Sequence, residues 1–290
     1  MPSSKKPDNN TAKPDQGATT ALDPAAAQIH SAPMLEILYR DAQLIAIDKP
    51  AGLLVHRSDI DRHETRFAVQ LLRDQIGRRV QPVHRLDKGT SGVLLFAFDA
   101  AVARALGRQF EGGAVEKTYL AVVRGWPAES GVIEHALSRQ HDDYGRKLPA
   151  ATAQPAVTHY RRLATVELPV AIDRYPHSRY ALVELKPLTG RHHQLRRHMK
   201  HISHPIIGDA THGKGVHNRF FQRELGCSRL LLACVGMVFH HPLSGARIVI
   251  DADILRPQAK VGAGWTAPDQ FAALLERFAW SQAIAPRPAA

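Results

Sequence analysis

An unbroken apolar run, Val93–Phe98, is the feature that most constrains the fold of this 290-residue chain. A run this short, preceded by Thr90-Ser91-Gly92 and followed by Asp99, is typical of a buried strand. An aspartate side chain accepts hydrogen bonds from the first free N–H groups of a helix, so Asp99 can cap a helix that follows directly. The sequence therefore predicts a buried strand that leads at once into a helix.

Apolar patterns predict further elements on both sides of this strand. Residues 35–39 and 44–47 predict a hairpin, and residues 65–76 predict a helix. A basic helix is expected over 190–201 and an amphipathic helix over 268–278. Further strands are expected at 118–124, 157–166, 179–185, 229–239 and 246–250. Because strands dominate and their connections vary in length, the pattern predicts an α+β fold rather than a regular βαβ repeat.

The two ends of the chain differ from its middle in composition. Residues 1–33 are rich in Ala, Pro, Ser, Thr, Asp and Asn and hold few large apolar side chains. Such a segment cannot bury enough apolar surface to offset the entropy lost on ordering, so a disordered tail is expected. Residues 283–290 have the same character. The folded domain is therefore expected to span 34–282.

The chain carries a large excess of positive charge. Its formal net charge is +11 and its pI is about 9.9, which favours nucleic acid as a partner, with an ordinary basic soluble protein as the alternative. No apolar run approaches the roughly 20 residues of a membrane helix, so no membrane partner is expected. Cys227 and Cys234 lack the spacing of a zinc site or a disulfide framework, which favours a cytoplasmic protein. We expect a monomer.

One acidic residue, Asp87, lies between Arg85 and Lys88 in the segment His84–Gly92, just before the buried strand. Residues on a connection next to a rigid sheet are well placed for chemistry. The alternative is that the Asp87 side chain only stabilises a turn. A protein that merely binds RNA has no use for a carboxylate among basic residues, because it would repel phosphate. Asp87 therefore distinguishes an enzyme from a non-catalytic RNA-binding protein.

Basic residues crowd the segment Leu188–Lys200. Leu195, Met199 and Ile202 recur at helical spacing and predict the stripe of a helix that faces the core. The basic residues then lie on other faces, and a helix N-terminus after Gly190 offers free N–H groups to phosphate. A solvated basic surface is the alternative. Because the cluster lacks balancing acidic residues, contact with a phosphate backbone is the better interpretation.

Five short motifs resemble those of the RluA-type pseudouridine synthase family. They are Asp48-Lys49-Pro50-Ala51-Gly52, His84–Phe96 with its H-R-L-D and T-S-G elements, Lys117-Thr118-Tyr119, Thr189–His198 and His204–Asp209. One such motif would be weak support, but five in the family's order, spread over most of 34–250, form a specific resemblance. It implies a mixed, mostly antiparallel central sheet flanked by helices. No segment resembles the small S4 RNA-binding domain that many relatives carry.

The resemblance implies an enzyme that isomerises uridine to pseudouridine in structured RNA without a cofactor. Asp87 is implied to be the nucleophile, Arg191 the cation that keeps it ionised, and Tyr119 the residue that stacks on the target base. Arg85 is implied to fill the gap that the extruded base leaves. The other implied RNA contacts are Lys49, His193, Gln194, Arg196, Arg197 and Lys200.

Several stretches are similar to a tRNA-modifying branch of this family. They are Leu54–Ser58, Leu72–Gly77, Val123–Trp126, Gln154–Tyr160 and Arg174–Pro176. This closer similarity implies tRNA as the partner and the uridine at position 65 as the target. The same chemistry on a ribosomal RNA uridine is the alternative.

A cluster of histidines raises the alternative of a metalloenzyme. His198, His201 and His204 are spaced by threes, so a helix could align some of them. Carboxylate or cysteine ligands at the spacing of a zinc site are missing nearby. His193 and His198 already belong to the motifs of the synthase family. No metal site is therefore expected.

Overall fold

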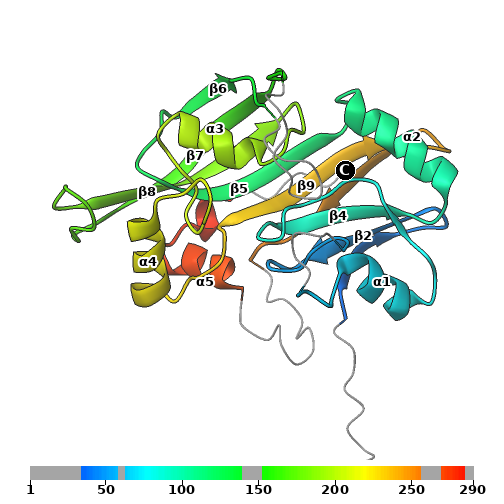
Figure 1. The fold of residues 1–290 in the computed structure, drawn as a ribbon, viewed down its shortest axis with the longest axis horizontal. Helices are drawn as coiled ribbons and strands as arrows, with labels where there is room; N and C mark the ends of the chain where they lie inside the picture. The colour runs from blue at the N-terminus through cyan, green and yellow to red at the C-terminus, as the bar shows by residue number, and fades with distance from the viewer. Residues whose placement is uncertain (1–33, 58–62, 139–151, 256–268, 285–290) are drawn as a thin grey trace, which may run out of the picture. The chain divides into compact units, whose positions relative to one another are not determined.

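The computed structural model describes residues 34–57, 63–138, 152–255 and 269–284, all of which belong to one compact unit, Ala32–Ala290. Its strands form a mixed sheet whose main path runs β1-β2-β4-β9-β5-β8-β7-β6, with β3 paired to β4 and β10 to β9 (Figure 1). The strands are β1 Glu36–Arg40, β2 Leu44–Lys49, β3 Gln81–Pro82, β4 Ser91–Ala97, β5 Glu116–Arg124, β6 Ser130–Glu134, β7 Val157–Leu168, β8 Ser178–Pro187, β9 Leu232–His240 and β10 Arg247–Asp251. The helices are α1 Ala68–Ile76, α2 Ala100–Glu111, α3 Gln194–His201, α4 Gly215–Glu224 and α5 Gln270–Arg277, with a short 3-10 helix at Ser281–Ala283.

The sheet is mostly antiparallel, as expected. The exception is the pair formed by β4 and β9, which run parallel where Ser91 faces Ala233 and Gly92 faces Cys234. Every residue of β4 is buried, which confirms the interpretation of the apolar run. The hairpin of β1 and β2 and the later strands lie where the sequence predicted them, within a few residues. The α+β fold is therefore confirmed.

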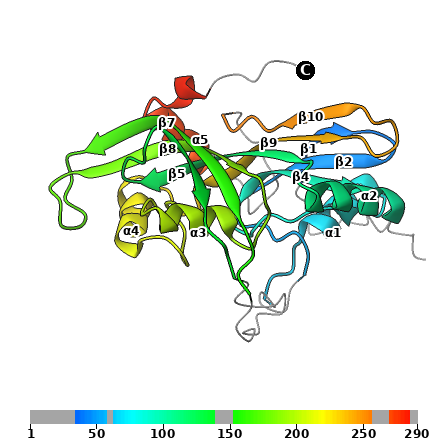
Figure 2. The ribbon, with the colours of Figure 1, turned by 90° about the horizontal axis from the view of Figure 1, so that it is seen from above.

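Two apolar cores cover the two faces of the sheet. One core contains Leu72 of α1, Leu106 of α2 and Met199 of α3, and these three helices lie on the same side of the sheet (Figure 2). The other core contains Phe221 of α4 and Leu274 of α5. The face covered by α1, α2 and α3 is the one that carries the candidate site described below.

The predicted helix signals are present, but α1 and α3 begin later than predicted: α1 begins at Ala68 instead of residue 65, and α3 begins at Gln194. Asp99 accepts hydrogen bonds from Ala101 N and Val102 N at the start of α2, and Gly77 ends α1 with a positive φ of 65°. The basic helix α3 begins only at Gln194, later than the predicted Gly190, because His193 adopts a left-handed conformation with φ 53°. Arg191 therefore lies before the helix and is exposed, whereas Arg196 lies on the helix and is buried.

The C-terminal boundary of the folded region was predicted wrongly. The tail was expected from residue 283, but Ala283 ends the 3-10 helix and Ile284 packs against the core that contains α5. The folded region therefore extends to at least Ile284, because this side chain still finds apolar surface to cover. The predicted tail 1–33 and the rest of the C-terminal tail lie outside the described residues. The short strands β3 and β6 and helix α4 were not predicted.

Gly92 is the residue that lets β4 approach β9. Its φ is 106°, and a Cβ added there would lie 2.0 Å from the carbonyl oxygen of Cys234. We expect Gly92→Ala to lower the free energy of unfolding by about 3 kcal/mol or more, from backbone strain and overpacking together. Urea unfolding curves measure this change.

Gly107, in the middle of α2, offers the matched control. A Cβ there meets nothing within 4 Å, and alanine favours helix over glycine by about 0.5–1 kcal/mol. Gly107→Ala is therefore expected to leave stability unchanged or to raise it slightly. A Gly92→Ala protein as stable as Gly107→Ala would contradict the close contact between β4 and β9.

No helix within the described residues is long and apolar enough to cross a membrane.

Candidate active site

Asp87 lies on the short connection between β3 and β4, and its loop is held by backbone contacts. Thr90 N donates to the carbonyl oxygen of Asp87 over 3.0 Å. The carbonyl oxygen of the next residue, Lys88, accepts from Gly52 N at 2.7 Å and from Lys49 Nζ at 3.3 Å. The Asp87 side chain remains 23% exposed. The fold thus fixes the backbone of this loop and leaves the carboxylate open to solvent.

A buried arginine from α3 faces this carboxylate. Arg196 Nη1 donates to Asp87 Oδ2 over 2.9 Å. The rest of the guanidinium binds Asp209, with Nε to Oδ2 at 2.7 Å and Nη2 to Oδ1 at 2.8 Å. Burial alone would lower the pKa of Arg196, but hydrogen bonds and charge from Asp209 and Asp87 raise it above its ordinary value. Arg196 is therefore a fixed cation beside Asp87.

His193 also approaches Asp87, but as a neutral ring. Its Nε2 lies 3.7 Å from Asp87 Oδ2, and its Nδ1 lies 3.0 Å from His212 Nε2. Burial lowers the pKa of His193 to about 4. The negative charge of Asp87 opposes this shift, and the positive charge of Arg196 adds to it. The ring is uncharged at neutral pH, so the positive charge beside Asp87 belongs to Arg196.

Tyr119 of β5 adds an aromatic ring to the same site. It is 9% exposed and faces Cys234 of β9 in the register of the sheet. Burial raises its pKa well above the usual value, with contributions from the Cys234 thiol and from the charge of Asp87. The phenol therefore keeps its proton. The fold brings together Asp87, Tyr119 and Arg196 from three separate motifs.

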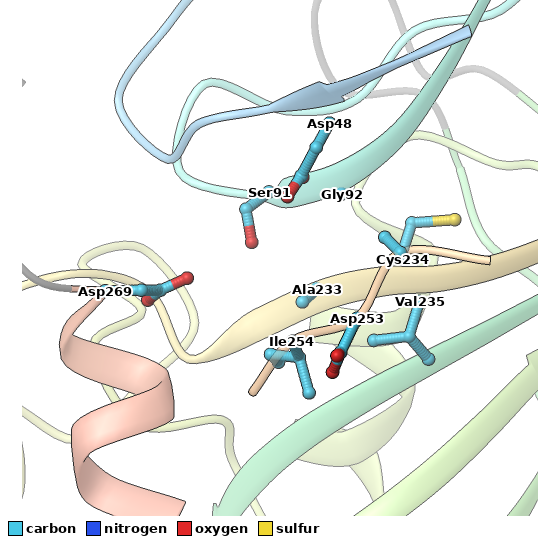
Figure 3. Close-up of a pocket in the computed structure, with 10 residues that line it drawn as sticks. Asp48, Ser91, Gly92, Ala233, Cys234, Val235, Asp253, Ile254 and Asp269 are labelled. Carbon is cyan, nitrogen blue, oxygen red and sulfur yellow. The ribbon is translucent and has the colours of Figure 1, made fainter. Parts of the chain in front are cut away.

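A small cavity beside the first residues of β4, Ser91 and Gly92, is separate from this site. It is lined by Asp48, Ser91, Asp253 and Asp269, among others (Figure 3). Its volume of about 10 Å³ gives room for roughly one water molecule, so it is too small for a nucleoside. Within the described ranges, no cluster of three or more His, Cys, Asp or Glu side chains could hold a metal ion.

Comparison with known proteins agrees with this geometry. The model of the family described as RNA pseudouridylate synthase matches residues 43–201. The chain belongs to the RNA pseudouridylate synthase family. It is 48% identical over 265 residues to tRNA pseudouridine synthase C of Pectobacterium carotovorum subsp. carotovorum, covering 91% of this chain and 67% of that protein. The enzyme of the same name from Yersinia pestis is 49% identical over 255 residues, covering 87% and 94%.

Solved structures of the family show the same fold. Human RNA Pseudouridylate Synthase Domain Containing 1 superposes with a TM-score of 0.60 at 25% identity, covering 89% of this chain and 98% of that one. Human RNA Pseudouridylate Synthase Domain Containing 4 gives a TM-score of 0.59 at 26% identity, covering 84% and 93%. The fold that the sequence motifs implied is therefore that of the pseudouridylate synthases.

The cation that faces Asp87 in this synthase is Arg196, and the assignment of that position to Arg191 was wrong. Arg191 is exposed, and its Nε donates to the carbonyl oxygen of Pro155 over 3.2 Å. It lies in the turn before α3, whereas Arg196 lies on the helical face directed inward. The left-handed residue His193 separates the two arginines and turns them toward different surroundings.

Three of the expected RNA contacts are buried in the synthase and bonded to protein atoms. Lys49 Nζ donates to the carbonyl oxygens of Pro50 and Leu53 at 2.9 and 2.8 Å. Gln194 Nε2 donates to Val157 O and Thr158 Oγ1, each at 3.0 Å. Arg196 is occupied by two carboxylates, as described above. The geometry contradicts a phosphate contact for these three side chains, because their polar atoms already have partners.

The remaining expected RNA contacts stay predictions. Arg85 and Lys200 are exposed. Arg197 is partly exposed and its Nη1 donates to Ser138 O over 2.9 Å. His193 is half-buried beside Asp87. The stacking of Tyr119 on a base and the nucleophilic role of Asp87 also await experiment.

Sequence reasoning missed Asp209 and His212 as parts of the site. Asp209 stands in a motif that carried the family resemblance, but no role was assigned to it. The sequence offered one signal for Asp209, namely an acidic residue within a motif that is otherwise apolar or basic. An aspartate that the fold buries needs a cation or several donors, and the basic segment ending at Lys200 supplies that cation as Arg196.

The buried Lys49 predicts a distinctive dependence of stability on pH. Burial, followed by the charge of Arg229, lowers the pKa of Lys49 from 10.5 to about 7, although Asp87 and Asp48 oppose the shift. Between about pH 7 and pH 10 the unfolded chain then binds more protons than the folded protein. The contribution of Lys49 to the free energy of unfolding should therefore rise with pH in this window, by up to about 1.4 kcal/mol per unit.

The variant Lys49→Met isolates this contribution, because it keeps an unbranched side chain and removes the titrating group. Urea unfolding of both proteins at pH 7, 8 and 9 gives their difference in stability. We expect Lys49→Met to be the less stable protein, since it leaves carbonyl oxygens without a donor. The deficit should grow as the pH rises. A deficit that is constant with pH would mean that the pKa of Lys49 is not lowered.

Proposed function

We propose that this chain isomerises uridine to pseudouridine in tRNA, with Asp87 as the nucleophile. The observation that carries the proposal is the pairing of a solvent-accessible carboxylate with a buried guanidinium, Arg196, at 2.9 Å. Tyr119 supplies an aromatic ring at the same site. The substrate class follows from relatives named tRNA pseudouridine synthase C that share nearly half of the sequence.

The reaction needs groups that the site contains. The bond between C1′ and N1 of the uridine breaks, a bond between C1′ and C5 forms, and the hydrogen of C5 leaves as a proton while N1 gains one. Nothing is oxidised or imported, so no cofactor is required. An ionised carboxylate must stay charged beside the ribose or the base, and a cation at hydrogen-bonding distance stabilises that charge. Arg196 does this for Asp87.

The target uridine has to leave its stack before the carboxylate can reach it, which costs a few kcal/mol. Arg85 is exposed and stands two residues before Asp87 in the sequence, which supports a role for it in filling the gap in the RNA. We propose the uridine at position 65 as the target, on the strength of the similarity to the tRNA-modifying branch. A monomeric state and a cytoplasmic location remain predictions from the sequence.

Release of tritium from RNA labelled at C5 of uridine tests the proposal, because a new bond at C5 expels that hydrogen. A tRNA transcript and ribosomal RNA are labelled and assayed separately. A second tRNA transcript carries cytidine in place of uridine 65. We expect about one tritium released per tRNA, and none from the cytidine transcript. Release from ribosomal RNA alone would keep the chemistry and reject the substrate. No release from either would reject the proposed function.

A further inference from the structure

Asp209 is a buried carboxylate bound by several donors. It is 2% exposed. Besides the two nitrogens of Arg196, its Oδ1 accepts from Thr211 N at 2.9 Å and from His212 N at 2.8 Å. Burial would raise the pKa of Asp209, but the hydrogen bonds and charge of Arg196 and the backbone donors lower it. Asp209 is therefore held as an anion that receives a two-pronged guanidinium contact.

This contact fixes the direction of the guanidinium. The nitrogens of arginine lie in one plane, so binding Nε and Nη2 to one carboxylate sets the orientation of Nη1. In this structure Nη1 points at Asp87 Oδ2 over 2.9 Å. Asp209 alone could neutralise the buried charge of Arg196. The contact between Asp209 and Arg196 does more than neutralise charge, because it orients Nη1 of Arg196 toward the carboxylate of Asp87, the candidate nucleophile.

A second chain of contacts connects Asp209 to Asp87, through His212 and His193. The backbone of His212 is held by Asp209 Oδ1, and His212 Nε2 lies 3.0 Å from His193 Nδ1. The other nitrogen of His193 lies 3.7 Å from Asp87 Oδ2. One carboxylate thus organises Arg196 and His193, two of the side chains that flank Asp87.

We propose that Asp209 is a positioning residue of this enzyme, which aims Arg196 directly, and His193 through His212, at Asp87. The proposal rests on the proposed function, since it concerns the same reaction. Asp209 does not touch the RNA, because its side chain has no exposed surface. Its removal should therefore slow the chemical step and leave RNA binding nearly unchanged.

The test compares Asp209→Asn with a matched control, Asp269→Asn. Asp269 also forms a buried ion pair, Arg229 Nη1 to Asp269 Oδ1 at 2.7 Å, with side chains 12% and 5% exposed. It stands at the start of α5 (Figure 3), whose residues Phe271 and Leu274 belong to the second apolar core. Both substitutions replace one carboxylate oxygen by an amide nitrogen, which cannot accept a hydrogen bond from arginine. Only the first is expected to disturb Asp87.

The measurements are tritium release under single-turnover conditions at saturating tRNA, the dissociation constant for tRNA, and urea unfolding to verify that each protein is folded. We expect Asp209→Asn to slow release by about 100-fold, as misplaced catalytic geometry does, with the dissociation constant within about threefold of wild type. Asp269→Asn should lose stability but release tritium at nearly the wild-type rate per folded molecule.

A double-mutant cycle with Arg196→Lys separates positioning from general damage. If Asp209 acts through Arg196, adding Asp209→Asn to Arg196→Lys should slow release much less than it does in the wild type. Asp209→Glu keeps the negative charge but displaces the carboxylate. It replaces Asp209→Asn in the test if that variant does not fold, and we expect a similar loss of rate. A folded Asp209 variant at the wild-type rate, or equal losses in both backgrounds, would overturn the proposal. An inactive wild type would overturn the proposed function itself and this inference with it.

Discussion

Asp87→Asn is expected to release tritium from labelled tRNA on the order of 10⁴-fold or more slowly than the wild type, since the nucleophile is lost. Asparagine has nearly the same shape but no negative charge, and Arg196 Nη1 can still donate to its oxygen. The free energy of unfolding should change by about 2 kcal/mol or less, because one partly exposed contact is altered. Binding of tRNA should be kept or become tighter, since a carboxylate near phosphate is removed.

Asp41→Asn is the matched control for this experiment. Its side chain is 25% exposed against 23% for Asp87, and it also lies close to a basic group, with 3.2 Å between Asp41 Oδ2 and His241 Nε2. It lies in the turn between β1 and β2. Tritium release by Asp41→Asn should match the wild type once the folded fraction is taken into account. Full activity of Asp87→Asn would remove the carboxylate from the mechanism.

The sequence was a good guide to the sheet because its signals are local. The run that became β4 is apolar throughout, and Asp99 carries its capping role in its own side chain. The strands β3 and β6 were not predicted because they are only two and five residues long and most of their side chains are exposed, so they carry little pattern. Helix α4 was missed because few of its side chains are buried.

The site was predictable where a motif places a residue on a rigid element. Asp87 precedes β4 and Tyr119 lies in β5, with β9 between them in the sheet, and the resemblance to the family motifs had assigned both residues to one site. The choice between Arg191 and Arg196 depended on one backbone conformation, at His193, and on Asp209 from a distant segment. Neither is visible in the pattern of the basic segment.

Buried polar side chains were the other source of error. Lys49 and Gln194 were assigned to RNA because basic and amide groups commonly bind phosphate and bases. Both instead satisfy carbonyl oxygens inside the protein. Such carbonyls belong to loops and to strand ends without a partner in the sheet, and they need donors when buried. The sequence does not show which loops will be buried, so it cannot separate these two uses of a donor.

Arg196→Gln is expected to damage both stability and activity, whereas Arg191→Gln should do little. Removing the guanidinium leaves the buried Asp209 carboxylate with backbone donors but no cation, and breaking a buried pair in this way costs about 3–5 kcal/mol. Asp87 loses its cation at the same time, so tritium release should fall on the order of 10²–10³-fold. Arg191 is exposed and its guanidinium donates to a carbonyl oxygen, so its replacement should change stability by less than about 0.5 kcal/mol.

The comparison decides between the two arginines because both variants remove one positive charge from the same segment. A general electrostatic effect on tRNA binding would raise the Michaelis constant in both, with a similar change in its dependence on salt. An effect on the carboxylate would lower the turnover rate in one of them only. Steady-state tritium release over a range of tRNA and salt concentrations gives the Michaelis constant and the turnover rate of each variant, and urea unfolding gives its stability. Loss of turnover in Arg191→Gln with normal turnover in Arg196→Gln would mean that the guanidinium facing Asp87 during the reaction comes from the turn before α3 and not from the helix.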